Sequence, residues 1–343
     1  MGDFYNGNKL LSLKDKNGKD PELYFCCGNR TAGKTFFFKR WMMRRFVNHG
    51  ERFVLFVRFI DDIANAAAGF WADIGPIAFT GHELTQKPLL HGKAGELLYD
   101  GRRCGYIIAL NDPERIKRNS ALFADAERGF LDEFMSEEGK YVPNELRKFN
   151  SIRISIARGG ARGTHARRFP VYLCSNNVTL FNPYFSYLKI ADRIQNRTHY
   201  LRGEGWVLEQ TFNVAAAEAL KDNFETVSEE EIAYAASNEY LLDNNKFVKE
   251  IPGDKHCALI IKYNGKTYGV WGMARRDIWY VSRKKGTGPL YTIVTNHEDH
   301  DEGTVLLTKS SSFVKNLREC YAQGLIRFDS GASKNAFLSA MMI

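Results

Sequence analysis

One short stretch constrains this chain more than any other: Gly28-Asn29-Arg30-Thr31-Ala32-Gly33-Lys34-Thr35. It matches G-x-x-x-x-G-K-[ST] at every required position. An apolar run, Leu23 to Cys27, precedes it, and a helical pattern that ends near Gly50 follows it. A strand, a glycine-rich turn and a helix in this order direct backbone N–H groups and a helix N-terminus at an anion. The sequence therefore predicts a phosphate-binding loop.

The residue types in this loop predict how a nucleoside triphosphate and its metal ion are held. Lys34 is expected to reach the β- and γ-phosphates, and the Thr35 hydroxyl is expected to ligate Mg²⁺. Arg30 has two interpretations: it places a second positive charge near the triphosphate, or it faces solvent. We predict ATP and Mg²⁺ as cofactors, with nucleotide contacts from Gly28, Asn29, Arg30, Thr31, Ala32, Gly33, Lys34 and Thr35.

An acidic pair, Asp132 and Glu133, follows the short apolar run Gly129-Phe130-Leu131. Phosphoryl transfer to water needs a carboxylate near Mg²⁺ and a group that orients the attacking water. We expect Asp132 to bind Mg²⁺ through a water molecule. Glu133 is expected to orient or activate the water that attacks the γ-phosphate. Arg128 and Gly129 stand where such a strand is normally aliphatic, and similar runs also begin helices or lie in solvated loops. The upstream phosphate-binding loop favours the catalytic interpretation.

A later apolar run, Val171 to Cys174, ends in the polar residues Ser175 and Asn176. In P-loop motors such a strand lies beside the strands that carry the phosphate-binding loop and the acidic pair. Its terminal polar side chain can then sense the γ-phosphate. We include Asn176 among the expected nucleotide contacts; an ordinary turn at the end of a strand is the alternative.

Strand-length apolar runs alternate with helical segments over residues 1–207. Phe53 to Phe59 and Ile107 to Leu110 are further expected strands, and Asn144 to Ala157 has helical composition. This alternation predicts an α/β domain with a mainly parallel sheet.

The pattern changes after Trp206. Residues 208–244 are rich in alanine and glutamate, which predicts a small helical linker. Residues 245–343 contain strand-length runs joined at Asn264-Gly265, a strong hairpin signal, and an expected helix over Phe313 to Gln323. A chain of 343 residues is long enough for two domains, so this second part is expected to be a separate α+β domain.

Composition limits the partners and the compartment. The formal net charge of +8 suggests a polyanionic partner, with nucleic acid favoured over an acidic membrane surface. No stretch has the length of a membrane span, and the first residues lack a signal-peptide pattern. The six cysteines form no C-x-x-C pair. We therefore expect a reduced, cytoplasmic protein without a structural metal ion.

A basic stretch lies between the acidic pair and the strand at Val171. One of its arginines can reach the ATP of a neighbouring subunit as a trans-acting finger. Others can contact DNA phosphates in a central pore. The alternative is a solvated basic helix followed by a flexible loop. The stretch consists of Arg147, Lys148, Arg153, Arg158, Arg162, Arg167 and Arg168.

Several motifs occur in one order: GNRTAGKT, FLDEF, YVPNE, LCSNNVTLFNPYF, KYNGKTYGVW and GLIRFD. Together they resemble the DNA-packaging ATPases of phi29-like short-tailed phages, from about Phe4 to Phe328. The resemblance implies an ASCE-type P-loop ATPase that forms a ring, usually of five subunits, at the portal vertex of an empty procapsid in the host cytoplasm. Such a ring binds a packaging RNA and drives double-stranded DNA inward.

The resemblance also assigns residues. Lys34 and Thr35 match the Walker A residues, and Asp132 and Glu133 match the Walker B aspartate and the catalytic glutamate. Arg158 matches the trans-acting arginine when positions are counted forward from YVPNE. Counting back from SNN gives a different answer, which leaves three rivals: Arg162, Arg167 and Arg168.

The second domain resembles the family's RNase H-like domain. Two-metal nuclease chemistry needs clustered carboxylates, beginning with one on the first strand. The expected first strand, CALIIKYNG, carries Lys262 and no acid, while Asp277 and Asp299 are isolated. We therefore expect a domain without nuclease activity that docks nucleic acid. Its basic stretches Arg275-Arg276 and Arg283-Lys284-Lys285 would suit that role; the alternative is that each is an ordinary solvated turn.

Three other functions compete with a packaging motor. A cellular DNA helicase or translocase would share the ATPase core. A non-catalytic scaffold would bind nucleotide and nucleic acid without turnover, which the short run before Asp132 would allow. A terminase with an active nuclease is disfavoured by the missing acid on the first strand of the second domain.

Overall fold

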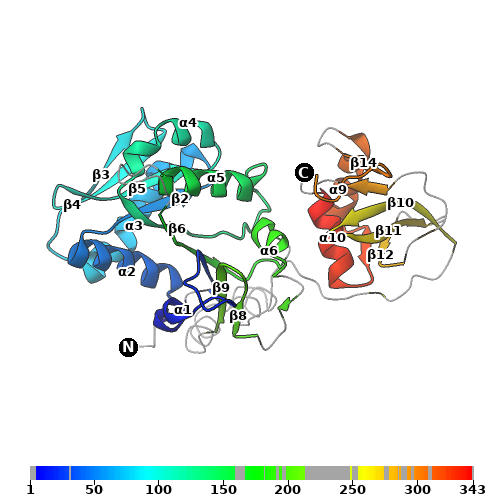
Figure 1. Cartoon of the computed structure of the whole chain (residues 1–343), viewed down its shortest axis with the longest axis horizontal. Helices are drawn as coiled ribbons and strands as arrows, with labels where there is room; N and C mark the ends of the chain where they lie inside the picture. Colours follow the sequence, from blue (N-terminus) through cyan, green and yellow to red (C-terminus); the bar gives the residue numbers. More distant parts are fainter. Residues whose placement is uncertain are drawn as a thin grey trace, which may run out of the picture. The chain divides into compact units, whose positions relative to one another are not determined.

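The fold is taken from a computed structural model of the whole chain (Figure 1). It describes residues 5–30, 32–158, 167–180, 182–190, 193–194, 198–212, 248, 254–273, 278–284, 286, 292–294, 297–307 and 311–341. The chain divides into two compact units. The first comprises Met1–Thr179 with Gln195–Leu242, and the second comprises Leu180–Ile194 with Asp243–Ile343.

The first unit is built on a nine-stranded sheet in the order β3-β4-β5-β2-β6-β7-β1-β9-β8. The five strands from β2 to β9 run parallel, as does β5 on the other side of β2. Strand β7 lies between β1, which leads into the phosphate-binding loop, and β6, which leads to the acidic pair. An inserted strand at this place defines the ASCE class, so the predicted α/β fold is confirmed. These five strands are β1 (Leu23–Gly28), β2 (Arg52–Val57), β6 (Ala126–Leu131), β7 (Val171–Asn176) and β9 (Trp206–Thr211).

The remaining strands extend the sheet at both ends. They are β3 (Leu84–Leu89), β4 (Ala94–Tyr99), β5 (Arg102–Ala109) and β8 (Tyr200–Arg202). The helices of this unit are α1 (Asn8–Ser12), α2 (Lys34–His49), α3 (Ile63–Ala78), α4 (Pro113–Arg118) and α5 (Glu145–Arg158), with short 3₁₀ turns η1 (Ile60–Asp62) and η2 (Ser120–Phe123). Among the described helices of the chain, none is long and apolar enough to cross a membrane.

The two faces of the sheet are covered by different helices because successive strand residues point to opposite faces. Phe53 and Leu55 of β2 belong to a core that includes Phe38 of α2 and Phe70 of α3. Phe56, on the other face of β2, packs edge to face on a phenylalanine of α5. The strand ends are thereby fixed between two layers of helices, and the loops that follow them carry the candidate site.

The second unit has a six-stranded sheet in the order β14-β13-β10-β11-β12-β15. Strands β10, β11 and β12 form an antiparallel meander. Strand β13 pairs in parallel with the other edge of β10, and β14 pairs in parallel with β13, which is the arrangement of RNase H-like domains. Its elements are α6 (Pro183–Tyr187), β10 (Lys255–Tyr263), β11 (Lys266–Met273), β12 (Trp279–Ser282), β13 (Thr292–Val294), β14 (Thr304–Leu306), α9 (Ser312–Ala322), β15 (Ile326–Phe328) and α10 (Gly331–Met341). The hairpin predicted at Asn264-Gly265 is confirmed, with both residues at positive φ.

Some expectations need adjustment. Strand β9 pairs with β1 through Thr211, so the first sheet extends past the boundary expected at residue 207. The β3–β4 hairpin and α3 were not anticipated from the sequence. Most of the expected helical linker, 208–244, lies outside the described residues, as do Arg275-Arg276, Asp277 and Lys285.

Candidate active site

The phosphate-binding loop joins β1 to α2, as expected. Gly33 takes φ 87° immediately before α2, a left-handed conformation that favours glycine. A Cβ at Gly28 would lie 2.3 Å from the Thr211 carbonyl oxygen, so glycine is also required by the close approach of β9. Asn29 and Ala32 are buried, and Thr31 lies outside the described residues.

Lys34 lies inside the loop with only 5% of its surface exposed. Its ammonium group donates hydrogen bonds to the backbone carbonyls of Gly28 (3.2 Å) and Asn29 (2.6 Å). It also lies 3.5 Å from Oδ1 of Asn176, at the end of β7. The lysine is therefore held in the loop by groups that an incoming phosphate can replace.

Thr35 and Asp132 meet across the gap between α2 and β6. The Thr35 hydroxyl donates to Oδ1 of Asp132 at 3.0 Å. A hydroxyl and a carboxylate side by side are hard oxygen ligands of the kind that Mg²⁺ takes, so this pair fits the metal. Burial raises the pKa of Asp132, and the nearby Lys39 ammonium and the Thr35 hydrogen bond oppose that rise.

Glu133 is exposed and has an unusual backbone. Its φ is 51°, in the left-handed region that costs a non-glycine residue free energy. Its backbone N–H donates to Oδ1 of Asp132 at 3.1 Å. The carboxylate therefore stands at the mouth of the site on a backbone that its surroundings must hold in place.

Arg58, just after β2, provides that hold. Its guanidinium donates to the carbonyl oxygens of Glu133 (2.8 Å) and Phe134 (2.6 Å), and to Oε2 of Glu145 (3.1 Å). It also lies 4.9 Å from the ring centroid of Tyr141. We call this group the Arg58 clamp: Arg58 with Glu145 and Tyr141.

Glu145 anchors the clamp. Its side chain is fully buried, and its Oε2 also accepts from the Val142 N–H at 2.9 Å. The YVPNE motif thus contains the tyrosine and the glutamate that close the loop after the acidic pair. In the sequence the motif indicates a family resemblance but no role for its tyrosine or its glutamate, and Arg58 stands in no motif.

The two polar residues at the end of β7, Ser175 and Asn176, have different surroundings in the structure. Asn176 faces Lys34, whereas the Ser175 hydroxyl lies 3.5 Å from the Met135 carbonyl, inside the loop after β6. Arg30 is exposed, and its guanidinium forms an ion pair with Glu137.

A pocket of about 570 Å³ lies beside the acidic pair, between the ends of β2 and β6 and the helix α3. Both carboxylates of the pair line it, together with three cations, Lys39, Arg58 and Lys140. The acidic pair is therefore reachable from solvent by a water molecule on the side away from the phosphate-binding loop.

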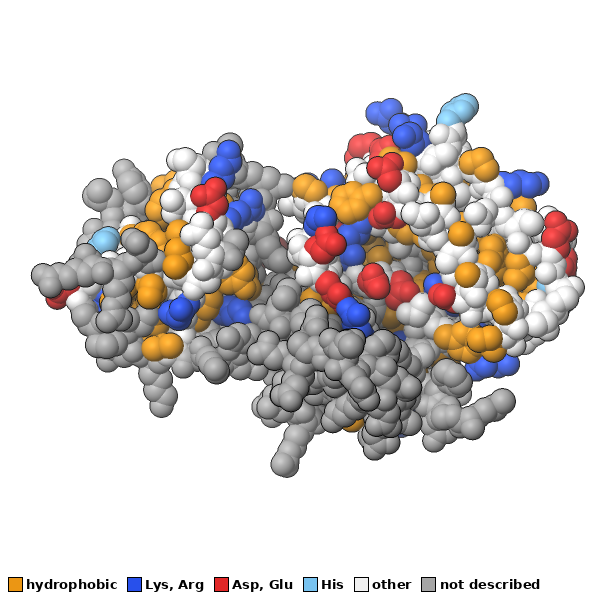
Figure 2. Space-filling model, turned by 180° about the vertical axis from the view of Figure 1, so that it is seen from behind, with side chains coloured by type: hydrophobic (Ala, Val, Ile, Leu, Met, Phe, Trp, Pro, Cys, Tyr) orange, Lys and Arg blue, Asp and Glu red, His pale blue; other side chains and the backbone are white. Residues whose placement is uncertain are grey.

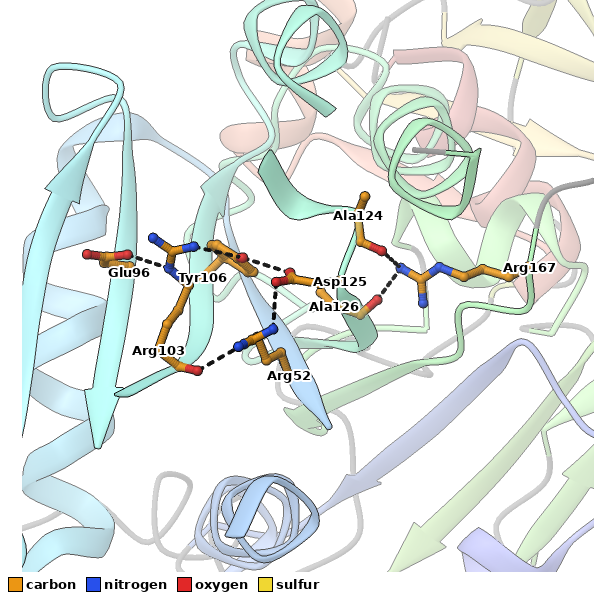
Figure 3. A network of polar contacts seen from close by, with 8 residues as sticks. All are labelled: Arg52, Glu96, Arg103, Tyr106, Ala124, Asp125, Ala126 and Arg167. Carbon is orange, nitrogen blue, oxygen red and sulfur yellow. Dashed lines mark hydrogen bonds and ion pairs between the residues drawn. The ribbon is translucent and has the colours of Figure 1, made fainter. Parts of the chain in front are cut away.

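The candidate finger arginines have different surroundings, and Figure 3 shows those of Arg167. Arg167 donates to the carbonyl oxygens of Ala124 (2.7 Å) and Ala126, where β6 begins. Arg168 donates to the carbonyl oxygen of Pro21 at 2.6 Å. Arg158 is the exposed last residue of α5, and Arg162 lies outside the described residues.

Arg158, Arg167 and Arg168 lie near the starts of the parallel strands, away from the phosphate-binding loop of their own subunit. Figure 3 shows Arg167 beside a network in which Arg52 pairs with Asp125 (2.8 Å) and Tyr106 donates to the same carboxylate (2.7 Å). These contacts lie where the parallel strands begin, and the phosphate-binding loop lies where they end. Since the Arg167 N–H bonds the Ala157 carbonyl, Arg158 also lies at that opposite edge.

Charge on the surface is mixed. On the face seen in Figure 2, lysines and arginines are interspersed with acidic side chains. The net positive charge of the chain therefore does not appear there as one uniform basic face.

Comparisons with known proteins agree over the whole chain. A family model described as the podovirus DNA encapsidation protein (Gp16) matches residues 2–340. The DNA packaging proteins of Bacillus phages PZA and phi29 are 26% and 25% identical, each over 97% of this chain and 95% of the relative. Among solved structures, the bacteriophage phi29 genome packaging motor assembly aligns at TM-score 0.60 and 22% identity over 99% of both chains. The Phi-28 gp11 DNA packaging motor aligns at TM-score 0.61 and 16% identity, over 100% of this chain and 97% of that one.

The strand order and the phosphate-binding loop define the class of protein: an ASCE-type P-loop ATPase domain joined to an RNase H-like unit. The family model narrows this class. The chain belongs to the podovirus DNA encapsidation protein (Gp16) family.

Proposed function

We propose that this DNA-packaging protein is an ATP-hydrolysing motor subunit that moves double-stranded viral DNA into a preformed procapsid. The observation that carries the proposal is the meeting of Lys34, Thr35 and Asp132 at one edge of the sheet, with Glu133 beside them. We further propose a homo-oligomeric ring, pentameric as in the resembling family, at the portal vertex in the host cytoplasm, with a packaging RNA as a partner.

The roles of the site residues follow from their chemistry. Lys34 would exchange its contacts with the Gly28 and Asn29 carbonyls for phosphate oxygens, and Asn176 beside it would respond to the γ-phosphate. Thr35 and Asp132 would hold Mg²⁺, which when bound neutralises charge on the phosphate oxygens. Glu133 would orient the attacking water and accept its proton.

We propose Arg158 as the trans-acting finger. It is exposed and lies at the edge of the sheet opposite its own phosphate-binding loop, so it can serve only another subunit. Arg167 and Arg168 are less suited because backbone carbonyls of their own subunit hold them. A cation at the neighbouring triphosphate would stabilise the charge of the transition state.

The second unit is proposed to bind nucleic acid without cutting it. Lys262 of the first strand, β10, pairs with Asp301 at 2.5 Å. Asp299 accepts backbone N–H groups of the β10–β11 turn. Both carboxylates are thus engaged in holding the fold, which supports a role without two-metal chemistry.

The test is steady-state ATP hydrolysis with and without double-stranded DNA, for the wild type and for Glu133→Gln. We expect turnover stimulated by DNA in the wild type and lost in Glu133→Gln, with ATP binding retained. Glu204→Gln, which changes an exposed carboxylate, is the matched control and should keep wild-type turnover.

Other outcomes would favour the competing functions. No turnover by the wild type, even with procapsid, packaging RNA and DNA, would favour a non-catalytic scaffold. DNA translocation that needs neither procapsid nor packaging RNA would favour a cellular translocase. Metal-dependent cleavage of DNA would show that the second unit is an active nuclease.

A further inference from the structure

The second unit contains a small pocket that the ATPase site does not use. Its volume is about 150 Å³, and its walls come from the segment after α6, the β10–β11 hairpin and α10. All of these elements belong to the second unit. The lining residues are Lys189, Tyr263, Asn264, Lys266, Tyr268, Ala332 and Asn335, none of which is acidic.

Two lysines give the pocket its charge. Lys189 and Lys266 are both exposed, and neither has an ion-pair partner within the part of the chain that the structure describes. Lys262, on the same hairpin, is by contrast paired with Asp301. Two cations converge on one small pocket that has no counter-ion among the described residues, which is a favourable environment for an anion.

The hairpin side of the pocket is rigid. Asn264 and Gly265 form a tight turn with φ of 51° and 72°. Their N–H groups both donate to the buried carboxylate of Asp299, at 2.6 Å and 2.7 Å. The turn therefore presents Asn264 and Lys266 in fixed positions, and the charge of Asp299 is satisfied by the backbone.

The helix side offers a further donor. Asn335 of α10 is 4% exposed, and its Oδ1 accepts hydrogen bonds from Ser186 (3.1 Å) and Ser339 (3.3 Å). With its oxygen engaged by two hydroxyls, the polar group that Asn335 has left for the pocket is the amide nitrogen, which can only donate.

We propose that this pocket binds a phosphodiester group of a nucleic acid strand. Ammonium and amide donors without a carboxylate match phosphate oxygens. Tyr187, two residues before Lys189, exposes 64% of its surface and is available to stack on a base next to the bound phosphate. The proposal rests on the proposed function, because handling DNA and packaging RNA brings this unit to a phosphate backbone.

The test measures nucleic acid binding to the full-length chain without ATP, so its outcome does not depend on hydrolysis. A labelled single-stranded RNA of about twelve nucleotides, a length that one small domain can cover, forms one arm, and a duplex DNA forms the other. For the double variant Lys189→Ala/Lys266→Ala we expect Kd for RNA to rise ~10-fold at 0.1 M salt. The slope of log Kd against log salt should fall by about 0.7, which is the contribution of one phosphate contact on a single strand.

A second variant avoids loss of packing. Asn335→Asp keeps the shape and still accepts from the two serine hydroxyls, but it places a carboxylate beside the pocket and should also weaken binding. The matched control is Lys315→Ala, which removes one exposed charge from α9 of the same unit, away from the pocket, and should bind as the wild type.

The arms identify the source of the phosphate. Weakening in the RNA arm alone assigns the pocket to RNA, and weakening in the DNA arm alone assigns it to DNA. Weakening in both assigns it to the shared backbone. Wild-type Kd and salt slope in both arms for both pocket variants would overturn the proposal. An equal loss in Lys315→Ala would overturn it too, since the effect would then be one of overall charge.

Discussion

Replacing Arg58 with alanine should lower both catalysis and stability, and the two effects should separate. The side chain is only 12% exposed and donates to the Glu133 and Phe134 carbonyls and to the buried carboxylate of Glu145. Alanine removes all three hydrogen bonds and the contact with Tyr141. The loop that carries Glu133 would then be free to leave its strained conformation.

The loss of stability can be estimated from the buried Glu145 carboxylate, which Arg58→Ala leaves without its ion-pair partner. Removing one partner of a buried ion pair costs ~3–5 kcal/mol. The Val142 N–H still donates to Glu145, so we expect the lower end, ~3 kcal/mol. This corresponds to a fall in Tm of about 6–12 °C for a unit of ~200 residues. Displacement of Glu133 by ~1 Å should lower kcat ~100-fold.

The assay compares kcat, KM and thermal unfolding in three variants. Arg58→Ala should lower kcat with little change in KM for ATP, because the phosphate-binding loop keeps its contacts. Arg58→Lys keeps the charge but loses the forked geometry, so it should retain part of the stability and less of kcat. Arg58→Ala/Glu145→Gln removes the unpaired charge and should recover stability without recovering kcat. Wild-type kcat in a folded Arg58→Ala protein would refute the reasoning.

Three further predictions follow. Arg158→Ala, at an exposed site, should change stability by less than ~0.5 kcal/mol yet lower turnover of the assembled ring ~1000-fold. Arg167→Ala should instead lower stability by ~2–3 kcal/mol, because its hydrogen bonds to backbone carbonyls are lost. Thermal melts and DNA-stimulated ATPase rates distinguish the two variants. Burial raises the pKa of Asp132 in the folded state, so the carboxyl group favours folding only while it is protonated. Its contribution to the free energy of unfolding is complete below its unfolded pKa and is lost as the pH rises through its folded pKa. Asp132→Asn should therefore raise the Tm of the metal-free protein at pH 7 but not at pH 3. Gly129→Ala should cost ~1–3 kcal/mol because its Cβ would lie 2.5 Å from a phenylalanine ring of β2, while Gly69→Ala, in open space on α3, should gain ~0.5–1 kcal/mol in chemical denaturation.

Each of these has a contrary outcome. Equal losses of turnover in the two arginine variants would remove the distinction between a finger and a structural arginine. A Tm difference for Asp132→Asn that persists unchanged at pH 3 would show that its cause is not ionisation. A neutral Gly129→Ala would show that the ring of Phe56 can move aside.

The packing of Arg128 and Gly129 explains why the strand before the acidic pair lacks the usual aliphatic pattern in the sequence. The strand before Asp132 carries Arg128 and Gly129 where aliphatic residues are usual, yet β6 is complete. Arg128 lies 4.8 Å from the Trp41 ring centroid and pairs with Glu51, and Gly129 leaves room for the Phe56 ring. Residues far away in the chain thus supply the packing that local composition lacks.

The sequence by itself determined the parts of this protein whose chemistry is local. The phosphate-binding loop, its strand and its helix are contiguous, and Asn264-Gly265 is a turn whose backbone conformation its own residues favour. For these features the residue types and their spacing are sufficient.

Only the tertiary structure decided which distant residues support the site. Arg58 and Glu145 are far apart in the chain and meet because β2 and β6 are neighbours in the sheet. The same packing turns Asn176, rather than Ser175, towards Lys34, and ties Arg167 to the start of β6. A hydrogen bond across the sheet depends on strand order and side-chain direction, and neither is encoded in any one segment of the chain.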